Sequence, residues 1–326
     1  NGEMVQQCAA LLAEILFDPD ITDGRFNEKN TELEKQYLLD TIDAEINDKR
    51  TYATIRCKDV MCAEELCSIK KYGYREDAMK ITPESAAKAY EELLRTARVE
   101  IMFEGCGDPT LAKDIFAQKF AGVKREPIEL SRSLVKAQQG AVKEETERME
   151  VKQGKLVMGF RVEGIEDYRR MNMARITFAL FGGTANSLLF KNVREKMSLC
   201  YYCSSGYGRS NSIMMVSSGV EAENAQKARD EVLHQLEMLK NGEFTDRELE
   251  ETKLFIRTAL MATSDSLGAM DSWYLAQTVG GSEGSPDMEI ELSAQVSRED
   301  VIWVANHTHL DTVYMLMPNE NQKEAE

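Results

Sequence analysis

Both halves of the 326-residue chain repeat one order of elements, in which long amphipathic helices are followed by a shorter helix and a strand. The tract Ile81-Thr82-Pro83-Glu84 begins one such shorter helix, because threonine caps a helix well and proline suits its first turn. Val296-Ser297-Arg298-Glu299 begins another, and the same interval separates Ile81 from Arg98 and Val296 from Val313. The repetition predicts two related α+β domains, each a sheet with helices layered on one face.

Hydrophobic periodicity places the individual elements. In the first half we expect helices at 3–17, 28–46 and 53–69, a strand at 99–103 and a short helix ending near Phe120. In the second half we expect strands at 155–162, 201–206, 212–220 and 311–317, with helices at 170–180, 186–197, 223–240, 246–263 and 298–306. A polar stretch at 123–150 holds the connection and a first edge strand, so the predicted domains are 1–135 and 136–326.

Composition excludes several classes of protein. Forty Lys and Arg against 56 Asp and Glu give a net charge of −16, which argues against a nucleic-acid binder. No apolar run approaches the roughly 18 residues of a membrane span, and no secretion signal opens the chain. The seven cysteines are an odd number in a long chain, as expected for reduced thiols of a cytoplasmic protein. Because Asn1 lies inside a helical pattern, we expect native sequence to precede it.

Histidines and cysteines are the first candidates for chemistry. His307 and His309 have no acid or cysteine at a spacing that completes a zinc site, so a surface turn is the simpler interpretation. His234 shares its helix with leucines and is interpreted as structural. Cys200 and Cys203 form a C-x-x-C, but in an expected strand rather than at a helix start, which argues against a redox role. Cys57, Cys62 and Cys67 are five residues apart, so along an expected helix their side chains point in different directions.

The tract 180–201 has the densest signal, running Leu-Phe-Gly-Gly-Thr-Ala-Asn-Ser-Leu-Leu-Phe-Lys-Asn-Val-Arg-Glu-Lys-Met-Ser-Leu-Cys-Tyr. It resembles the C-terminal domain of the pitrilysin/insulinase family of inverted zinc metallopeptidases (inverzincins), which includes the mitochondrial processing peptidase. That pattern has a Gly-Gly turn, a Ser-x-Leu-Phe helix, Arg-Glu, and Leu-x-Tyr entering a strand. Ser198 departs from it, because glycine is common there in the family.

The resemblance extends to residues 32–42, which are similar to the family helix that carries the third zinc ligand. Glu34 matches the first of two glutamates on one helix face, and Thr41 occupies the position of the second, which binds metal in catalytic members. A neutral hydroxyl is a poor substitute for a carboxylate on zinc. The tract Asn47-Asp48-Lys49-x-x-Tyr52-Ala53 resembles non-catalytic bacterial members. The motif His-x-x-Glu-His does not occur in the 326 residues, but in the family it lies upstream of the part matched by residues 1–20.

Arg194 and Tyr201 are the site residues that the resemblance implies. In the family an arginine and a tyrosine at these positions bind substrate main chain and stabilise the oxyanion. Charged guanidinium donors and a rigid phenol donor suit that task. Without the resemblance, Arg194 would be interpreted as a surface salt bridge and Tyr201 as a core aromatic.

The resemblance therefore implies a non-catalytic, substrate-binding subunit of a two-component zinc metallopeptidase that acts on peptides. No catalytic or metal-binding residue is expected in this chain, and zinc would belong to a partner subunit of the same family, or to a second copy. Two alternatives stay open. The chain is an active zinc metalloendopeptidase if His-x-x-Glu-His lies upstream of Asn1, or it is a structural, peptide-binding subunit.

Overall fold

The structure is a computed structural model that describes residues 2–129 and 140–319. The chain divides into two compact units, and each unit is built from separate stretches of sequence. Unit 1 comprises Asn1–Ala44, Lys70–Arg132 and Leu267–Leu275, and unit 2 comprises Glu45–Ile69, Ser133–Ser266 and Ala276–Glu326. The predicted boundary near residue 135 lies outside the described residues. Residues 45–69, expected in the N-terminal domain, belong with the second unit.

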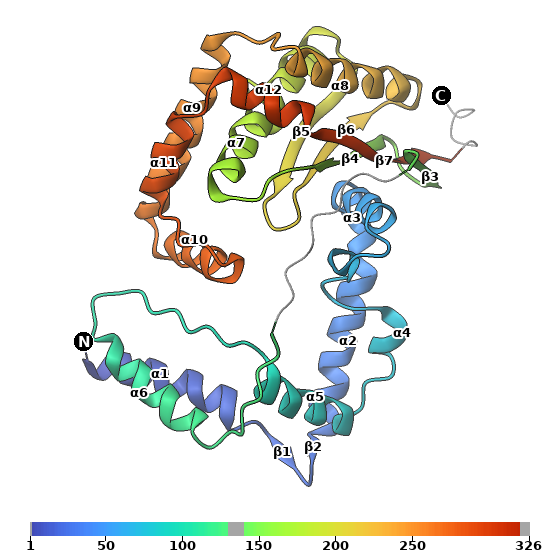
Figure 1. Cartoon of the computed structure of the whole chain (residues 1–326). Coiled ribbons are helices and arrows are strands. Elements are labelled where there is room, and N and C mark those ends of the chain that lie inside the picture. The colour runs from blue at the N-terminus through green and yellow to red at the C-terminus, as the bar shows by residue number, and fades with distance from the viewer. Residues whose placement is uncertain (1, 130–139, 320–326) are drawn as a thin grey trace. The chain divides into compact units, whose positions relative to one another are not determined.

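A five-stranded sheet forms the centre of unit 2 (Figure 1). Its order is β3-β7-β4-β6-β5, with the parallel pair β3–β7 at one edge and antiparallel pairs elsewhere. The strands are β3 (Lys143–Met149), β4 (Gly154–Val162), β5 (Cys200–Gly208), β6 (Ile213–Val220) and β7 (Thr308–Pro318). The edge strand expected within 123–150 is β3, and the strand predicted at 155–162 is β4.

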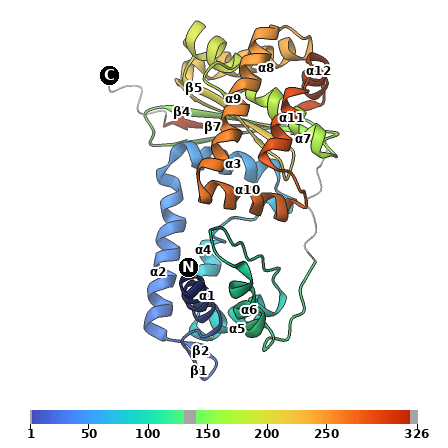
Figure 2. The same cartoon turned by 90° about the vertical axis from the view of Figure 1, so that its left-hand side faces the viewer.

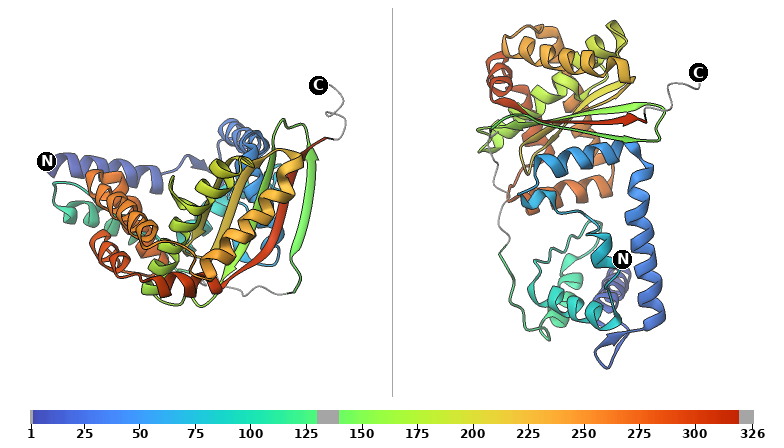
Figure 3. Two further views of the ribbon diagram at one scale, coloured as in Figure 1. Left: turned by 90° about the horizontal axis from the view of Figure 1, so that it is seen from above. Right: turned by 90° about the vertical axis from the view of Figure 1, so that its right-hand side faces the viewer.

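Strand β4 carries apolar side chains on both faces, and both faces are covered. Leu156, Met158 and Phe160 join the main core with helices α7 (Tyr168–Phe178), α8 (Ala225–Lys240) and α12 (Arg298–Asn306). Val157 points to the opposite face, where it packs against Ala53 of α3 (Lys49–Met61). The right panel of Figure 3 shows this sheet edge-on with α3 along one face. Helices layered on one face were predicted; α3 covers the second face as well, because an apolar face must be buried.

The remaining helices of unit 2 are α9 (Asp246–Met261) and α11 (Pro286–Ala294), which pack against each other. The helices at 223–240, 246–263 and 298–306 are confirmed to within a few residues. Two of these helices begin with a capping box. The side chains of Thr245 and Ser297 each accept a hydrogen bond from the backbone amide of the third helical residue, and the side chain of that third residue accepts one from the backbone amide of the cap.

Unit 1 is mainly helical. It contains α1 (Gly2–Phe17), α2 (Glu28–Ala44), α4 (Arg75–Ala78), α5 (Pro83–Thr96), α6 (Pro109–Phe120), the start of α10 (Leu267–Gly280), and a hairpin of β1 (Ile21–Thr22) and β2 (Arg25–Phe26). Helix α1 lies beside α6 (Figures 1 and 2), and their contact uses Ala9, Ala13, Ala112 and Phe116. Thr82 caps α5 with Pro83 in its first turn, as predicted.

Two expectations for the first half are wrong. Residues 99–103 form no strand, and no described residue pairs with them as a strand would. A lone strand leaves its amides and carbonyls without partners. The helix expected at 53–69 runs instead from Lys49 to Met61, because Asp48 caps its start and a turn follows Cys62. Along residues 2–129 and 140–319, no helix combines the length and apolar character needed to cross a bilayer.

Candidate functional site

The Gly-Gly turn of tract 180–201 packs tightly against strand β5. Helix α7 continues as the wider turn η3 (Ala179–Gly183), in which residues pair five apart. A Cβ atom on Gly182 would lie 2.7 Å from the backbone nitrogen of Ser205, so only glycine permits this approach. The Ser205 hydroxyl donates to the Phe178 carbonyl oxygen at 2.9 Å, which ties η3 to β5.

The segment that carries Arg194 is a second wide turn, η4 (Phe190–Lys196). It ends with the Met197 amide donating to the Asn192 carbonyl at 3.1 Å and the Leu199 amide donating to Val193 at 3.1 Å. Ser198 lies between them with φ 52°, in the left-handed region that favours glycine. The turn therefore keeps a conformation suited to the family glycine, although the residue is serine.

Tyr201 projects from a bulge at the beginning of β5. Cys200 pairs with Val220 and Tyr202 pairs with the adjacent Gly219, so Tyr201 is the extra residue on the bulged strand. Tyr201 is 63% exposed, which excludes the core aromatic considered as the alternative. A hydrogen bond from the hydroxyl to the Glu221 carboxylate, together with the charge of that carboxylate, raises the pKa of Tyr201.

Arg194 is exposed, and its guanidinium carbon lies 4.5 Å from the centre of the Phe190 ring. Within the described parts of the chain it has no carboxylate partner, so it is not the surface salt bridge considered as an alternative. This stacking restrains the Arg194 side chain, because Phe190 belongs to the same turn, η4. The planar donor edge of the guanidinium stays available for an acceptor.

Two hollows meet at Arg194. One is an open groove of about 340 Å³, lined by Arg194, Ser198, Leu199, Cys200, Tyr201, Glu221 and Asn224. The other, of about 230 Å³, contains Arg194 together with Gly182, Gly183 and Arg50. The groove thus brings together the two residues that the sequence predicted, Arg194 and Tyr201.

Arg50 is a site residue that the sequence did not indicate. It begins α3, in the half of the chain expected to form the N-terminal domain, and α3 belongs to unit 2. Its guanidinium donates to the Ser204 hydroxyl at 2.9 Å and lies 4.2 Å from the centre of the Tyr202 ring. The hollow therefore carries two arginines and no carboxylate among its lining residues. Only the packing of α3 on the sheet places Arg50 there, and no local motif could have predicted it.

The C-x-x-C thiols come together because of the same bulge. Residues three apart in a regular strand point to opposite faces, but the extra residue Tyr201 puts Cys200 and Cys203 on one face. A hydrogen bond from Cys203 lowers the pKa of Cys200 to about 7; burial opposes this shift, and Ser218 and the charge of Arg194 add to it. The partner thiol of Cys203 is buried, and its pKa is raised well above the ordinary value, first by the bond to Cys200.

Helix α2, which is similar to the family helix that carries the third zinc ligand, does not fit a catalytic zinc ion. Glu34 and Thr41 are both exposed on α2. The Thr41 hydroxyl donates to the Tyr37 carbonyl oxygen at 2.7 Å, within the helix itself. A neutral hydroxyl that is turned back onto its own helix lacks the negative charge of a carboxylate ligand. The residues present therefore support no step that uses a metal at α2.

The histidines do not gather into a metal site within the described ranges. The His307 ring stacks on Trp303 at 3.9 Å, and its Nδ1 lies 2.7 Å from the Trp303 carbonyl oxygen. His309 is 4.0 Å from a Glu163 oxygen. His234 is exposed on α8 and not part of the core. These positions leave the tract 180–201 and its two hollows as the candidate site.

Comparisons with known proteins identify the family. Residues 80–254, which are 175 of the 326 residues, match the family described as "Peptidase M16 inactive domain". The chain is 28% identical over 319 residues to the probable inactive metalloprotease YmfF of Bacillus subtilis (strain 168), covering 97% of this chain and 74% of that protein. The chain belongs to the M16 peptidase family and is a homologue of the inactive type.

Solved structures share the fold. A conserved protein from Enterococcus faecalis V583 superposes with a TM-score of 0.86 at 24% identity, covering 97% of this chain and 74% of that one. A peptidase M16 inactive domain from Pseudomonas fluorescens gives a TM-score of 0.73 at 18% identity, with 96% and 75% covered. These structures confirm the α+β fold class, and the family match over residues 80–254 confirms the family expected from tract 180–201.

Proposed function

We propose that this chain is the non-catalytic, substrate-binding subunit of a two-component zinc metallopeptidase whose partner subunit, of the same family, carries the zinc. The observation that carries the proposal is the groove in which the unpaired Arg194 guanidinium and the exposed Tyr201 lie together. Helix α2 has a threonine, Thr41, at the position of the zinc-binding glutamate of catalytic members, whereas the Arg194 and Tyr201 donors remain accessible.

The chemistry of the groove suits a peptide backbone. Arg194 offers charged, planar donors to carbonyl oxygens, and the Tyr201 hydroxyl can exchange its bond to Glu221 for a bond to substrate. Strand β5 is one of the two edge strands of the sheet, so an extended peptide has main-chain groups with which to pair. The second hollow adds Arg50, which favours a substrate carboxylate or carbonyl beside the Gly182-Gly183 turn.

The test uses the native complex. The chain is purified with its partner, the subunit that carries His-x-x-Glu-His is identified, and the pair is reconstituted from the two recombinant subunits. Cleavage of a quenched-fluorescent peptide library is then measured. We expect kcat/KM to fall about 100-fold for Tyr201→Phe and at least as much for Arg194→Ala, the usual effect of removing one transition-state donor.

Arg247→Ala is the matched control, because Arg247 is exposed on α9 and pairs only with surface Glu251. Unchanged turnover in both groove variants would contradict substrate binding and favour a structural subunit. Chelator-sensitive hydrolysis by the isolated chain would contradict the non-catalytic assignment and favour an active peptidase.

A further inference from the structure

Three side chains at the end of α3 have their potential ligand atoms close together. The Cys62 and Cys67 sulfurs and a Glu65 carboxylate oxygen all lie within 4.8 Å of one another. The even spacing of the cysteines predicts that they are scattered around one helix. That prediction is wrong, because the helix ends at Met61, before Cys62 and Cys67. The Glu65 amide donates to the Cys62 carbonyl oxygen at 2.8 Å, and this turn returns the chain so that Cys67 faces Cys62.

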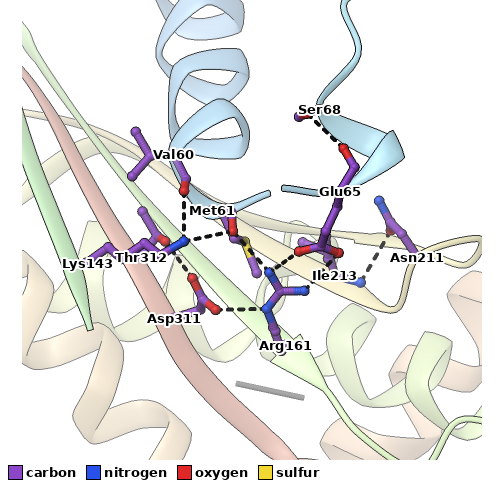
Figure 4. Close-up of polar contacts among 10 residues, drawn as sticks. All are labelled: Val60, Met61, Glu65, Ser68, Lys143, Arg161, Asn211, Ile213, Asp311 and Thr312. Atoms are coloured by element: carbon purple, nitrogen blue, oxygen red, sulfur yellow. Dashed lines mark hydrogen bonds and ion pairs between the residues drawn. The ribbon is translucent and has the colours of Figure 1, made fainter. Parts of the chain in front are cut away.

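The carboxylate of this cluster is held in place by the sheet (Figure 4). Arg161 of β4 donates to both Glu65 oxygens, one of them at 3.3 Å, and to Asp311 at 2.8 Å. A second N–H of one terminal nitrogen donates to the Met61 carbonyl oxygen at 3.1 Å. Arg161 is 4% exposed, so a buried guanidinium holds the Glu65 carboxylate in one position. A preorganised ligand loses little freedom when it binds an ion.

The charges around the cluster also suit a divalent ion. Arg161 and Lys143, whose amine donates to the Met61 carbonyl oxygen at 3.2 Å, balance Glu65 and Asp311. With both thiols protonated this group is neutral. Replacing the two thiol protons by one divalent cation leaves it neutral, so binding buries no net charge.

We infer that Cys62, Glu65 and Cys67 bind a zinc ion, a site distinct from the family's catalytic centre. The spacing C-x-x-x-x-C and the mixed sulfur and carboxylate donors are those of zinc ligands, and solvent takes the fourth position. In the binding step two S–H bonds break, two protons pass to solvent, and two Zn–S bonds and one Zn–O bond form without any change of oxidation state. The ion would fasten the turn after α3 to β4 through Glu65 and Arg161. The inference departs from the expectation that this chain binds no metal, and it does not rest on the proposed function.

The experiment titrates the reduced, metal-free full chain. With Cd²⁺ as probe we expect one equivalent of tight binding, seen as the ultraviolet charge-transfer absorption of cadmium thiolate. With Zn²⁺, measured against a chromophoric chelator, we expect one equivalent and release of about two protons per ion. Cys67→Ser should weaken binding at least 100-fold, whereas Cys67→His, which keeps a zinc ligand, should retain most of it.

Cys200→Ser/Cys203→Ser is the matched control, since that pair is the other place where two thiols meet. It should bind as tightly as the unaltered chain. Because Cys67 is only half-buried, its variants should stay folded, and circular dichroism checks this. Undiminished binding in Cys62→Ser/Cys67→Ser, or no stoichiometric binding by the unaltered chain, would overturn the site. So would a Cys62–Cys67 disulfide that forms readily in air while zinc fails to protect the thiols.

Discussion

At the scale of single residues, Ser198 shows how the fold constrains a position at which this chain has serine in place of the glycine common in the family. The turn from η4 into β5 needs a left-handed residue, and serine occupies it at φ 52°. A Cβ atom in that region costs about 1 kcal/mol relative to glycine. This turn directly precedes the bulge from which Tyr201 projects into the groove.

Ser198→Gly should therefore stabilise the protein by about 0.5–1 kcal/mol, since relief of the strained φ outweighs the greater freedom of glycine in the unfolded chain. Urea unfolding measures the change through the midpoint at constant slope. Ser210→Gly in the loop between β5 and β6, where φ is not positive, is the control and should stabilise nothing. A loss of stability in Ser198→Gly would contradict the strain.

Cys200 is the second residue-scale case, because its thiol should be ionised near neutral pH. The pKa of about 7 implies that the reactive thiolate is half-populated there, and its fraction rises with pH until it saturates. Alkylation of Cys200 by iodoacetamide should follow that curve, measured by peptide mass spectrometry. Cys203→Ser should shift the midpoint upward, because the strongest stabilising bond is weakened. A midpoint near 8.5, as for an ordinary thiol, would be the contrary result.

At the scale of elements, Arg161 connects α3 to the sheet. The burial of Arg161 lowers its pKa, but the bonds to Glu65 and Asp311 outweigh burial and raise it, so the guanidinium stays charged. Sequence periodicity located β4 correctly, but it could not indicate that Arg161 would meet Glu65, in the turn after α3, and Asp311 of β7. Those partners come from segments far away in the chain.

Arg161→Met should cost about 3–5 kcal/mol, because it removes the charged donor that is bonded to both the Glu65 and the Asp311 carboxylates. Equilibrium unfolding in urea gives the value. The triple variant Arg161→Met/Glu65→Leu/Asp311→Leu should recover much of the loss, because no charge then remains buried. A similar loss in Arg247→Met, an exposed arginine, would show that the assay does not report the buried network.

At the scale of the whole molecule, the compact units do not follow the order of the sequence. Residues 45–69 belong to unit 2, where α3 covers Val157, Tyr314 and Leu316 on one face of the sheet. The division at 135 that sequence composition suggests would leave this face without its cover. An exposed apolar sheet face is a predicted site of aggregation.

A fragment of residues 136–326 should therefore be unstable, bind the dye ANS and aggregate, whereas the same fragment joined through a flexible linker to residues 45–69 should fold cooperatively. Circular dichroism melting and light scattering distinguish the two. The linked fragment with Ala53→Asp is the control and should behave like the bare fragment, because Ala53 lies in the contact with Val157. If the bare fragment melts as cooperatively as the full chain, α3 is not needed to cover the sheet.

The amino-acid sequence by itself determined what depends on short spacing. The caps at Thr82 and Ser297, the helices that they begin, strand β4 and the family tract 180–201 all follow from neighbouring residues, and each is present. The pair Arg194 and Tyr201 could be named for the same reason. The strand at 99–103 failed because a strand requires partners, and local pattern carries no information about them.

Only the tertiary structure decided which distant groups meet. It placed Arg50 beside the Gly182-Gly183 turn, joined Glu65 to Arg161, and brought Cys62 to Cys67 and Cys200 to Cys203. Each of these contacts depends on where a helix ends or a strand bulges, since one residue more or less turns a side chain to another face. Hydrophobic burial then selects the packing that covers both faces of the sheet, and this long-range choice is not encoded at any single position.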